Sequence, residues 1–334
     1  MRLTQTILVT GATGAIGPRI VQALDEAGFR IRSFSVDTPA AGMFPQSVEV
    51  LIGDVTDQAA VQSAMRGVEA VVHMAALLHI VNLPPEMREK YECVNIGGTA
   101  KVVEAAMKAG VKRVVLFSTI AVYGPSSGSV LTEMSPTHPD TFYAETKRAA
   151  EQIVLKARDA DGRPLGTVLR LGAVYGSRIR GNYERLIRAL ARKRFIPVGN
   201  GLNRRTLVYD KDIGQAVVLA VSHPGAAGQV FNVTDGEFHT MNEIIESICS
   251  ALGRRPPTLT LSVSPVRRLV GMIEDGSRLC GLSSSVVRAT VDKYTEDVAV
   301  DGRKICEHIG FVPKYDLVAG WRETVDEMRQ SGDL

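Results

Sequence analysis

The sequence predicts an α/β fold of the Rossmann type, in which a doubly wound parallel sheet is joined to a smaller, interleaved α/β lobe. Short, nearly all-apolar runs alternate with helix-like segments through the first half of the chain. A glycine-rich turn follows the first of these runs and leads into an amphipathic stretch. The chain has 334 residues, of which 45% are hydrophobic, and it is therefore long enough to bury the core that this fold requires.

The glycine-rich turn spans Thr10–Gly17, between the apolar run Ile7–Val9 and the amphipathic run Ile20–Ala27. Its glycines permit a tight turn, let the backbone approach a phosphate and let the helix pack closely on the sheet. The start of the helix offers unpaired N–H groups to an anion. Glycines also gather in ordinary turns, but a strand before them and a helix after them favour a dinucleotide site. The residues expected to line this site are Gly11, Thr13, Gly14, Ala15, Ile16 and Gly17.

The other elements of the first half alternate in the same way, and each strand-like run is short and almost free of polar residues. Strands are expected at Arg30–Val36, Val48–Ile52, Ala70–His73 and Val114–Phe117. Helices are expected at Asp57–Met65, Asn95–Ala109 and Thr141–Arg158. Because such strands are buried on both sides, helices should cover both faces of the sheet.

The second half of the chain is less regular. Strands are expected at Val168–Arg170, Arg205–Val208 and Val230–Val233, and helices at Asn182–Lys193, Met241–Leu252 and Asp301–Ile309. Asp301 is the expected N-cap of the last helix, and Gly310 is expected to terminate it. We expect residues 1–170 to form mainly the dinucleotide-binding domain and residues 171–334 mainly a substrate-binding lobe, with residues 206–234 returning to the first domain.

Composition argues against several classes of protein. The net charge of +3 is too small to favour nucleic acid or a membrane surface as a partner. The longest apolar run, Ala70–Val81, is interrupted by His73 and His79 and is too short to cross a bilayer. These histidines lack a third ligand at useful spacing, so they are expected to be structural and no metal is expected. The cysteines are scattered as buried thiols would be in a reducing compartment, at Cys93, Cys249, Cys280 and Cys306. With no signal peptide at its start, the chain is expected to be cytoplasmic.

Tyr143 and Lys147 are the first candidates for catalysis. They are four residues apart on a predicted helix, so their side chains share one face. A phenol has a pKa near 10, and about 4 kcal/mol of preferential phenolate stabilisation would bring it near 7. A lysine ammonium and an oxidised nicotinamide ring close by can supply that stabilisation. Alone, such a pair is usually an ordinary helix pair, but behind a dinucleotide site the catalytic interpretation is favoured.

Taken together, these motifs resemble the extended short-chain dehydrogenase/reductase family, in its NAD-dependent nucleotide-sugar epimerase/dehydratase branch, which includes the UDP-glucose 4-epimerases. The resemblance covers nearly the whole chain. The matching segments are Thr10–Gly17, Gly53–Val55, His73–Ala76, Ser118–Gly124, the pair Tyr143 and Lys147, Gly199–Gly201, Arg205–Tyr209 and Asp212.

The resemblance implies a role for each matching residue. Thr119 would hydrogen-bond the reacting sugar hydroxyl, Tyr143 would exchange its proton, and Lys147 would bind the nicotinamide ribose and lower the pKa of the tyrosine. The other residues that it implies for NAD are Asp37, at the adenosine ribose, and Asp54, Val55, Ala75, Ala76 and Asn95. Asn182 and Arg205 are implied for the substrate, with Arg205 reaching its diphosphate.

The departures from the family pattern narrow the expected reaction. Ile120 and Ala121 stand where dehydratases carry acidic residues, so removal of water from the sugar is not expected. Ala173 replaces an asparagine that helps many members hold the nucleotide diphosphate, and Ser35 stands where NAD-binding members carry aspartate, two residues before Asp37. The expected function is NAD-dependent 4-epimerisation of a nucleotide sugar, such as UDP-glucose or a UDP-N-acetylhexosamine.

Three alternatives stay open. A nucleotide-sugar 4-ketoreductase would use the same residues, whereas a steroid-type alcohol dehydrogenase would have little use for Arg205. The third alternative is a non-catalytic dinucleotide sensor, which would have no need of Thr119, Tyr143 and Lys147 together. The family likeness also implies a homodimer that is joined through the helices Asn95–Ala109 and Thr141–Arg158.

Overall fold

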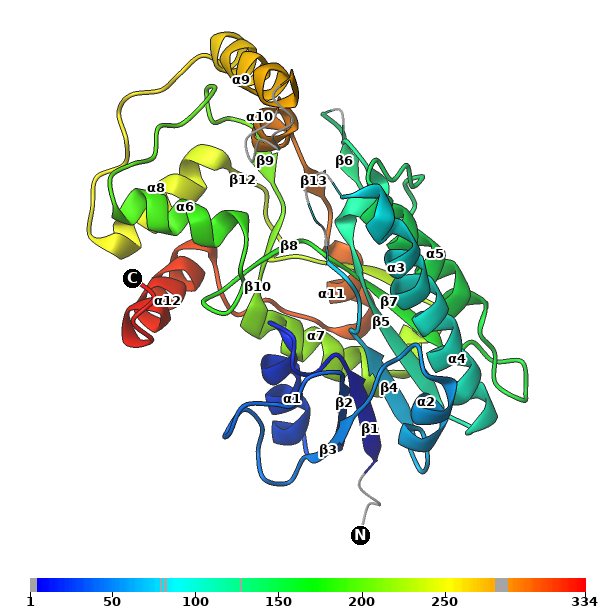
Figure 1. Ribbon diagram of the computed structural model, residues 1–334. Coiled ribbons are helices and arrows are strands. Elements are labelled where there is room, and N and C mark those ends of the chain that lie inside the picture. Colours follow the sequence, from blue (N-terminus) through cyan, green and yellow to red (C-terminus); the bar gives the residue numbers. More distant parts are fainter. Residues whose placement is uncertain (1–4, 79, 81–82, 127, 280–287) are drawn as a thin grey trace.

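A parallel sheet forms the centre of the computed structural model, which describes residues 5–78, 80, 83–126, 128–279 and 288–334 (Figure 1). Within these residues the sheet has seven strands in the order β11-β7-β5-β4-β1-β2-β3. Because the order runs outward in both directions from β1 and β4, the sheet is doubly wound, as expected. Its strands are β1 Thr6–Thr10, β2 Arg30–Ser35, β3 Glu49–Ile52, β4 Ala70–His73, β5 Arg113–Thr119, β7 Gly166–Leu171 and β11 Val230–Val233.

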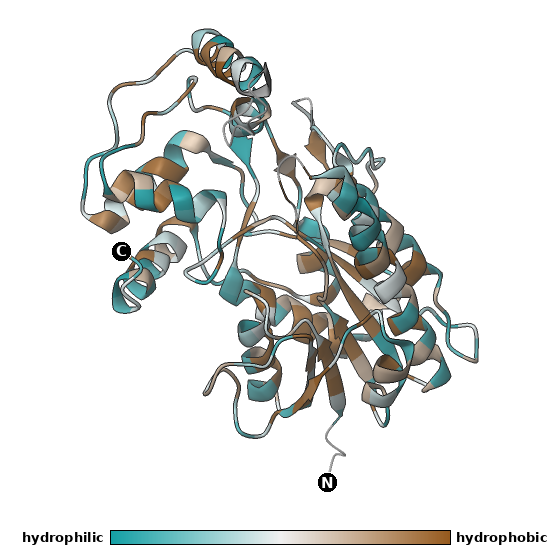
Figure 2. Cartoon of the chain, in the orientation of Figure 1, coloured by the Kyte–Doolittle hydropathy of each residue, from teal (hydrophilic) through white to brown (hydrophobic). Residues whose placement is uncertain are grey.

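Helices cover both faces of this sheet. Ile7 and Val9 of β1 lie in one hydrophobic cluster and Leu8 lies in another, because alternate side chains of a strand point to opposite faces. The first cluster takes in α1 Gly17–Glu26, α7 Asp210–Ser222 and α11 Arg303–Ile309. The second takes in α2 Gln58–Ala64, α4 Thr99–Lys108 and α5 Phe142–Lys156. Figure 2 shows the strands between these layers coloured mostly as hydrophobic.

A smaller lobe lies at the carboxyl edge of the sheet, around a third hydrophobic cluster centred on Trp321, whose ring stacks on Tyr175 with 4.1 Å between centroids. Its helices are α6 Asn182–Ala191, α8 Met241–Leu252, α9 Val263–Leu279, α10 Arg288–Thr295 and α12 Leu317–Gln330. Its strand pairs are β8 Ala173–Tyr175 with β10 Leu207–Tyr209, and β9 Arg204–Arg205 with β12 His239–Thr240.

Short elements complete the description. The strands β6 Val130–Leu131 and β13 Ala299–Val300 pair with each other. The short helices are η1 Pro85–Met87, α3 Arg88–Tyr91, η3 Ile120–Tyr123, η4 Pro224–Ala226 and the π-helical turn η2 Glu92–Gly98. Because α7, β11 and α11 return to the large sheet, the two lobes are interleaved.

Several elements differ from the sequence prediction. The helix expected at Asn95–Ala109 is α4, with the π-helical turn η2 before it. The cap prediction at Asp301 was wrong by one residue: Gly302 is the N-cap of α11, and Asp301 Oδ1 instead accepts a hydrogen bond from the Arg303 amide at 2.8 Å. Gly310 does end that helix, with a φ of 74°. The helices α7, α9, α10 and α12 were not predicted at all.

Candidate active site

The glycine-rich turn connects β1 to α1, and two of its glycines cannot be replaced without moving the backbone. Gly11 has a φ of +72°, and a Cβ there would lie 2.8 Å from the backbone of Ala75. A Cβ on Gly17 would lie 1.9 Å from the carbonyl oxygen of Ala12. No described side chain caps the N-terminus of α1, where Ile16 is the N-cap residue. The exposed residues Gly14 and Ala15 therefore border a helix start whose free N–H groups can receive a phosphate. The glycine-rich turn thus fits the pyrophosphate of a dinucleotide.

The carboxyl end of β2 lies beside this turn. The Ser35 hydroxyl accepts a hydrogen bond from the Thr13 amide at 3.2 Å, and Asp37 is exposed two residues further on. Arg32, which could have met a 2′-phosphate, instead binds Glu49 at 2.8 Å and two backbone carbonyl oxygens. Its guanidinium is thus occupied, and the acidic Asp37 suits the free ribose hydroxyls of NAD.

The next strand end carries the residues expected at adenine. Asp54 is exposed, and its Oδ1 accepts a hydrogen bond from the Thr56 amide at 2.8 Å. Val55 is buried, and a Cβ on Gly98 would lie 2.8 Å from its side chain. The two residues thus stand at the carboxyl end of β3, which is the sheet edge that the sequence predicted for them.

His73 links the ends of β1 and β4 and is part of the structure rather than a ligand. The Thr99 hydroxyl donates to the Asn95 carbonyl oxygen at 2.6 Å and therefore accepts from His73 Nε2 at 3.0 Å. His73 Nδ1 in turn accepts from the Thr10 hydroxyl at 2.7 Å. Burial and the nearby charge of Lys147 lower the pKa of His73 to about 3, so the ring is neutral. His79 lies outside the described residues.

Asn95 supports the segment that follows β4. Its Oδ1 accepts from the Leu77 amide at 2.7 Å, and its Nδ2 donates to the Leu77 carbonyl oxygen and to the Thr146 hydroxyl. The side chain is 1% exposed. Asn95 thereby fixes the chain beyond the partly buried Ala75 and Ala76 relative to α5, and its amide hydrogens are used within the protein.

Tyr143 and Lys147 lie in the first turns of α5, which begins where the Thr141 hydroxyl caps the Ala144 amide. Burial, and then the neighbouring Tyr91, raise the pKa of Tyr143 to about 12. Burial lowers the pKa of Lys147 to about 8, although the charge of Glu151 acts in the opposite direction. Lys147 is 4% exposed. Tyr143 itself is half-buried, and both causes act against its phenolate, so the stabilisation of the phenolate by Lys147 and an oxidised nicotinamide stays a prediction.

Thr119 ends β5, and its hydroxyl accepts a hydrogen bond from the Ala121 amide at 3.1 Å as the N-cap of η3. Its own proton stays available to donate to a substrate oxygen. Next in the chain, Ile120 is 9% exposed and packs with Val122, Tyr123 and Val300. Ala121 is half-buried, so both positions expected to be acidic in dehydratases are apolar here, and the first of them is buried.

A buried ion pair that the sequence analysis missed lies beneath these residues. Glu151, one turn after Lys147, accepts from Arg170 Nε at 2.9 Å, from Arg170 Nη2 at 2.7 Å and from the Ser118 hydroxyl at 2.6 Å. The Arg170 guanidinium also lies 4.7 Å from the centroid of the Tyr123 ring. Glu151 continues the four-residue spacing of Tyr143 and Lys147, and this spacing was a signal available in the sequence.

A cavity of about 210 Å³ opens beside Tyr143. It was also missed by the sequence analysis, which predicted no element between residues 74 and 94. The Arg88 guanidinium lies 4.7 Å from the centroid of the Phe142 ring at this cavity, and the Tyr91 hydroxyl donates to the Leu78 carbonyl oxygen. The lining residues are Ile80, Leu83, Arg88, Tyr91, Thr141, Phe142 and Tyr143. The Pro84–Pro85 pair before Glu86 was the available signal of a helix start.

The two residues expected at the substrate lie in the smaller lobe. Asn182 is the exposed first residue of α6. Arg205 pairs with His239 between β9 and β12, and its Nη2 donates to the carbonyl oxygens of Lys293 and Tyr294. Its buried Nε has no hydrogen-bond partner among the described residues. The role of both residues in substrate binding stays a prediction.

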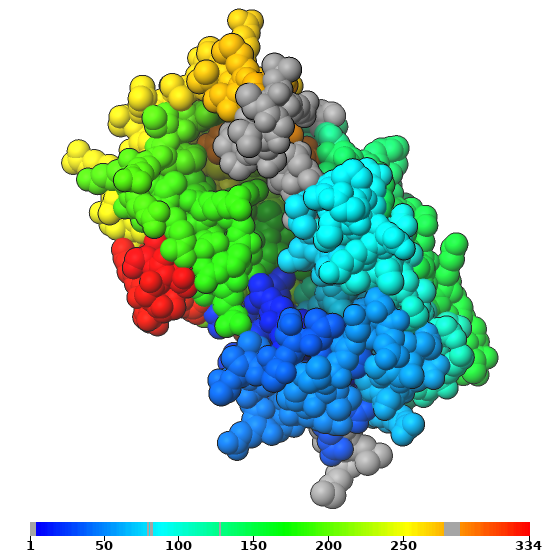
Figure 3. Space-filling model, viewed as in Figure 1, coloured from blue at the N-terminus to red at the C-terminus, as the bar shows by residue number. Residues whose placement is uncertain are grey.

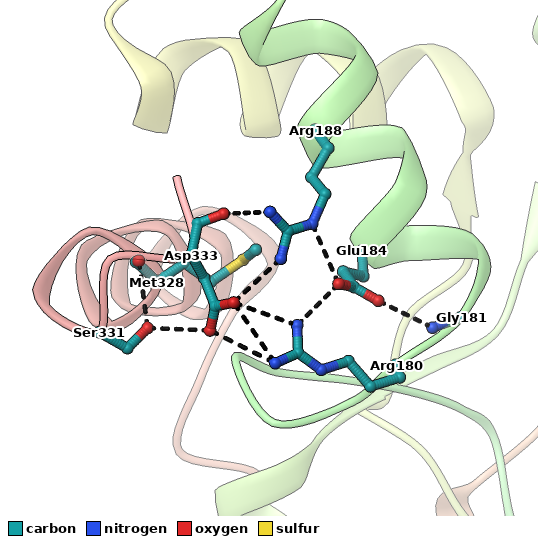
Figure 4. A network of polar contacts seen from close by, with 7 residues as sticks. All are labelled: Arg180, Gly181, Glu184, Arg188, Met328, Ser331 and Asp333. Carbon is teal, nitrogen blue, oxygen red and sulfur yellow. Dashed lines mark hydrogen bonds and ion pairs between the residues drawn. The ribbon is translucent and has the colours of Figure 1, made fainter.

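The segment Arg178–Arg194, which includes α6, is rich in basic residues. Figure 4 shows that two of its arginines form a network with the C-terminal residues: Arg180 and Arg188 both bind Glu184 and Asp333. The charges of Arg180 and Arg188 are therefore neutralised within the protein, without a bound ligand.

Two general findings bear on the site. In the described part of the chain, none of the helices combines the length and the apolar character needed to span a lipid bilayer. Cys93, Cys249 and Cys306 are free thiols, and Cys280 lies outside the described residues. Cys249 is buried as expected, but Cys306 is half-buried, and the expectation was wrong for Cys93, which is exposed.

Several known proteins are similar in sequence to this chain. The N-acetyl-α-D-glucosaminyl-diphospho-ditrans,octacis-undecaprenol 4-epimerase of Escherichia coli O157:H7 is 29% identical, covering 97% of this chain and 95% of that protein. The UDP-glucose 4-epimerase of Vibrio cholerae is 27% identical, with coverages of 99% and 98%. A 3β-hydroxysteroid dehydrogenase/Δ5→4-isomerase of Mycobacterium tuberculosis H37Rv is 29% identical, with coverages of 78% and 73%.

A solved structure shares the fold and carries the cofactor. MoeE5 in complex with UDP-glucose and NAD is 26% identical and superposes with a TM-score of 0.75, covering 98% of this chain and 99% of that one. The family model "NAD dependent epimerase/dehydratase family" matches residues 7–234. This chain therefore belongs to the NAD-dependent epimerase/dehydratase family and is an NAD-dependent enzyme of the extended short-chain dehydrogenase/reductase type.

Proposed function

We propose that the enzyme epimerises a nucleotide sugar at C4, with a UDP-hexose or a UDP-N-acetylhexosamine as substrate, through a transient 4-keto intermediate. The observation that carries this proposal is the set formed by Thr119, Tyr143 and Lys147, with the apolar Ile120 and Ala121 directly after the threonine. Such a site can oxidise or reduce one carbinol carbon but has no second acid at these positions. Two full-length relatives named as 4-epimerases support the choice.

Each residue has a defined task in this reaction. The Thr119 hydroxyl donates a hydrogen bond to the C4 oxygen and holds it near Tyr143. The Tyr143 oxygen takes the proton of that hydroxyl and returns it when the ketone is reduced on its other face. Lys147, one helical turn from Tyr143, would stabilise the phenolate by its charge. NAD, when bound, supplies the hydride acceptor and donor, and the glycine-rich turn and Asp37 would hold its pyrophosphate and ribose.

A 4-ketoreductase is the nearest alternative, because it would use the same three side chains. The two reactions differ in the fate of the cofactor. An epimerase keeps the reduced cofactor in place until the hydride returns, whereas a ketoreductase exchanges its cofactor at every turnover. Tight retention of NAD in the purified protein therefore favours epimerisation. A non-catalytic sensor would catalyse neither reaction.

The test is incubation of the purified protein with a panel of UDP-hexoses and UDP-N-acetylhexosamines without added cofactor. We expect one of them to yield its C4 epimer, separated by chromatography, and we expect NAD(H) to be released on acid denaturation. The panel should contain an undecaprenyl-diphosphate-linked N-acetylhexosamine and a 3β-hydroxysteroid, because relatives are named for such substrates. No epimer from any sugar, together with stoichiometric NAD(P)H consumption on a 4-keto sugar nucleotide, would establish the ketoreductase instead.

We further propose that the enzyme acts in the cytoplasm as a homodimer joined through α4 and α5. Met107, near the end of α4, is 48% exposed, as an apolar residue at such an interface would be in one isolated chain. Light scattering after gel filtration measures the mass directly. A mass of 36.0 kDa at micromolar concentration would contradict the dimer.

A further inference from the structure

Arg178 reaches from the smaller lobe to the glycine-rich turn. It lies in the segment that follows β8, and its Nε donates a hydrogen bond to the carbonyl oxygen of Ala15 at 3.4 Å. This contact joins residues 163 positions apart. In Figure 3 the green atoms of the second lobe come down to the dark blue atoms of the N-terminal region, where this turn lies. An arginine of one lobe thus stands at the phosphate-binding turn of the other.

The backbone directly before Arg178 is held by two contacts. Gly176 packs against Asp210 so closely that a Cβ would lie 2.5 Å from the carboxyl carbon. The Ser177 hydroxyl donates to Glu327 at 2.5 Å, and Glu327 also binds Arg19 of α1 at 2.7 Å. The segment is therefore anchored to the helix whose N-terminus faces the phosphate site, so the position of Arg178 relative to that site is set in advance.

The positive charge of Arg178 is not paired with any carboxylate of the described residues. Its single described contact is the long bond to a carbonyl oxygen, which leaves both Nη groups unused. In the same segment, Arg180 and Arg188 share Glu184 and Asp333, as Figure 4 shows. Because a guanidinium offers five donors in a fork that suits paired phosphate oxygens, the free donors of Arg178 fit an anion at this turn.

We propose that Arg178 binds the pyrophosphate of NAD from the second lobe, opposite the amide groups of the glycine-rich turn. The pyrophosphate would then be held from both lobes, by backbone N–H groups on one side and by a guanidinium on the other. The consequence for turnover rests on the proposed function: an epimerase that keeps its cofactor needs slow cofactor release, and a contact that spans both lobes slows release.

Calorimetry on protein freed of bound nucleotide tests this proposal with three probes: NAD, ADP-ribose and UDP. For Arg178→Ala we expect about tenfold weaker binding of NAD and of ADP-ribose, which share the pyrophosphate, and unchanged binding of UDP. Arg178→Lys should recover part of the loss, because it restores a charge without the fork. Arg185→Ala is the matched control, since Arg185 is an exposed arginine of α6 with no described side-chain contact.

Three results would overturn the proposal. Unchanged affinity for ADP-ribose in Arg178→Ala would remove Arg178 from the cofactor site. A loss confined to UDP would assign it to the other diphosphate, and equal losses with all probes, or the same loss in Arg185→Ala, would reveal only a general effect of charge. None of these measurements requires turnover, so failure of the proposed epimerisation would leave the outcome readable.

Discussion

Replacing Glu151 with Gln should destabilise the protein strongly, because this carboxylate neutralises a buried arginine. Glu151 is 0% exposed and Arg170 is 5% exposed. Although burial lowers the pKa of Arg170, the hydrogen bonds and charge of Glu151 raise that pKa above its usual range, so the guanidinium stays charged. The NH2 end of the Gln side chain would meet a donor of the guanidinium, and the neutral amide would leave the charge of Arg170 without compensation.

The expected cost follows from the geometry. The variant loses the carboxylate charge and the acceptor of one of the two hydrogen bonds from Arg170, of 2.7 and 2.9 Å, at a site that is buried. Breaking a buried ion pair from one side typically costs about 3–5 kcal/mol of unfolding free energy. Replacing both partners by apolar side chains removes the unpaired charge, so Glu151→Leu with Arg170→Met should cost less than Glu151→Gln alone.

Urea unfolding of the wild type, both variants and Glu104→Gln measures these differences. Glu104 pairs with Lys108 on the surface of α4, and its replacement should change stability little. A loss of under about 1 kcal/mol in Glu151→Gln, or a double variant less stable than the single one, would refute this account of the pair.

Further predictions concern the chemistry and the pH dependence. Tyr143→Phe should keep NAD binding yet lose at least about 100-fold in turnover, and near-normal turnover would contradict its role as the proton-transferring residue. Arg205→Ala should weaken UDP binding by about 2 kcal/mol and leave NAD binding unchanged in calorimetry; equal binding of UDP would remove Arg205 from the site. Because Ile120 and Ala121 cannot transfer protons, mass spectrometry should find no 4-keto-6-deoxy product from any nucleotide hexose. His73 takes up a proton near pH 6.5 when unfolded but only near pH 3 when folded, so the free energy of unfolding should fall as the pH drops between these values, and less steeply in His73→Gln; parallel slopes would contradict this.

The fold was predictable from the sequence wherever apolar runs have clear ends. The bounds of β4, β11 and α8 match the prediction. Polar or glycine residues flank β11 and α8 on both sides, and β4 follows Glu69 and ends at the polar His73. The helices α7 and α12 were missed for different reasons. Most of α7 is buried on several sides, so its sequence shows little amphipathic period. In α12 the buried face does repeat with the helical period, but it includes Gly320 and Thr324, which do not register as apolar.

The local motifs of the site were also predictable, whereas its long-range contacts were not. A glycine turn, or a tyrosine four residues before a lysine, is visible within one short segment. The ion pair between Glu151 and Arg170 joins a helix to a strand, and the contact of Arg178 with Ala15 joins the two lobes. Nothing in the order of residues says which arginine will be close to which oxygen once the chain has folded. Such pairs depend on packing that composition and spacing do not encode.

The π-helical turn η2 adds one residue to the helix that continues as α4, compared with regular α-helical geometry. Deleting a residue within Glu92–Gly98 would let the turn relax to α-helical geometry, with little loss of helix. Residues on the N-terminal side of the deletion would rotate by about 100° relative to α4. A deletion just after Asn95 would therefore swing its amide away from Leu77 and Thr146, so that the protein could fold while its catalytic helix was no longer tied to the loop after β4. The extra residue of η2 thus sets the orientation of Asn95, and with it the alignment of α5 with the loop after β4.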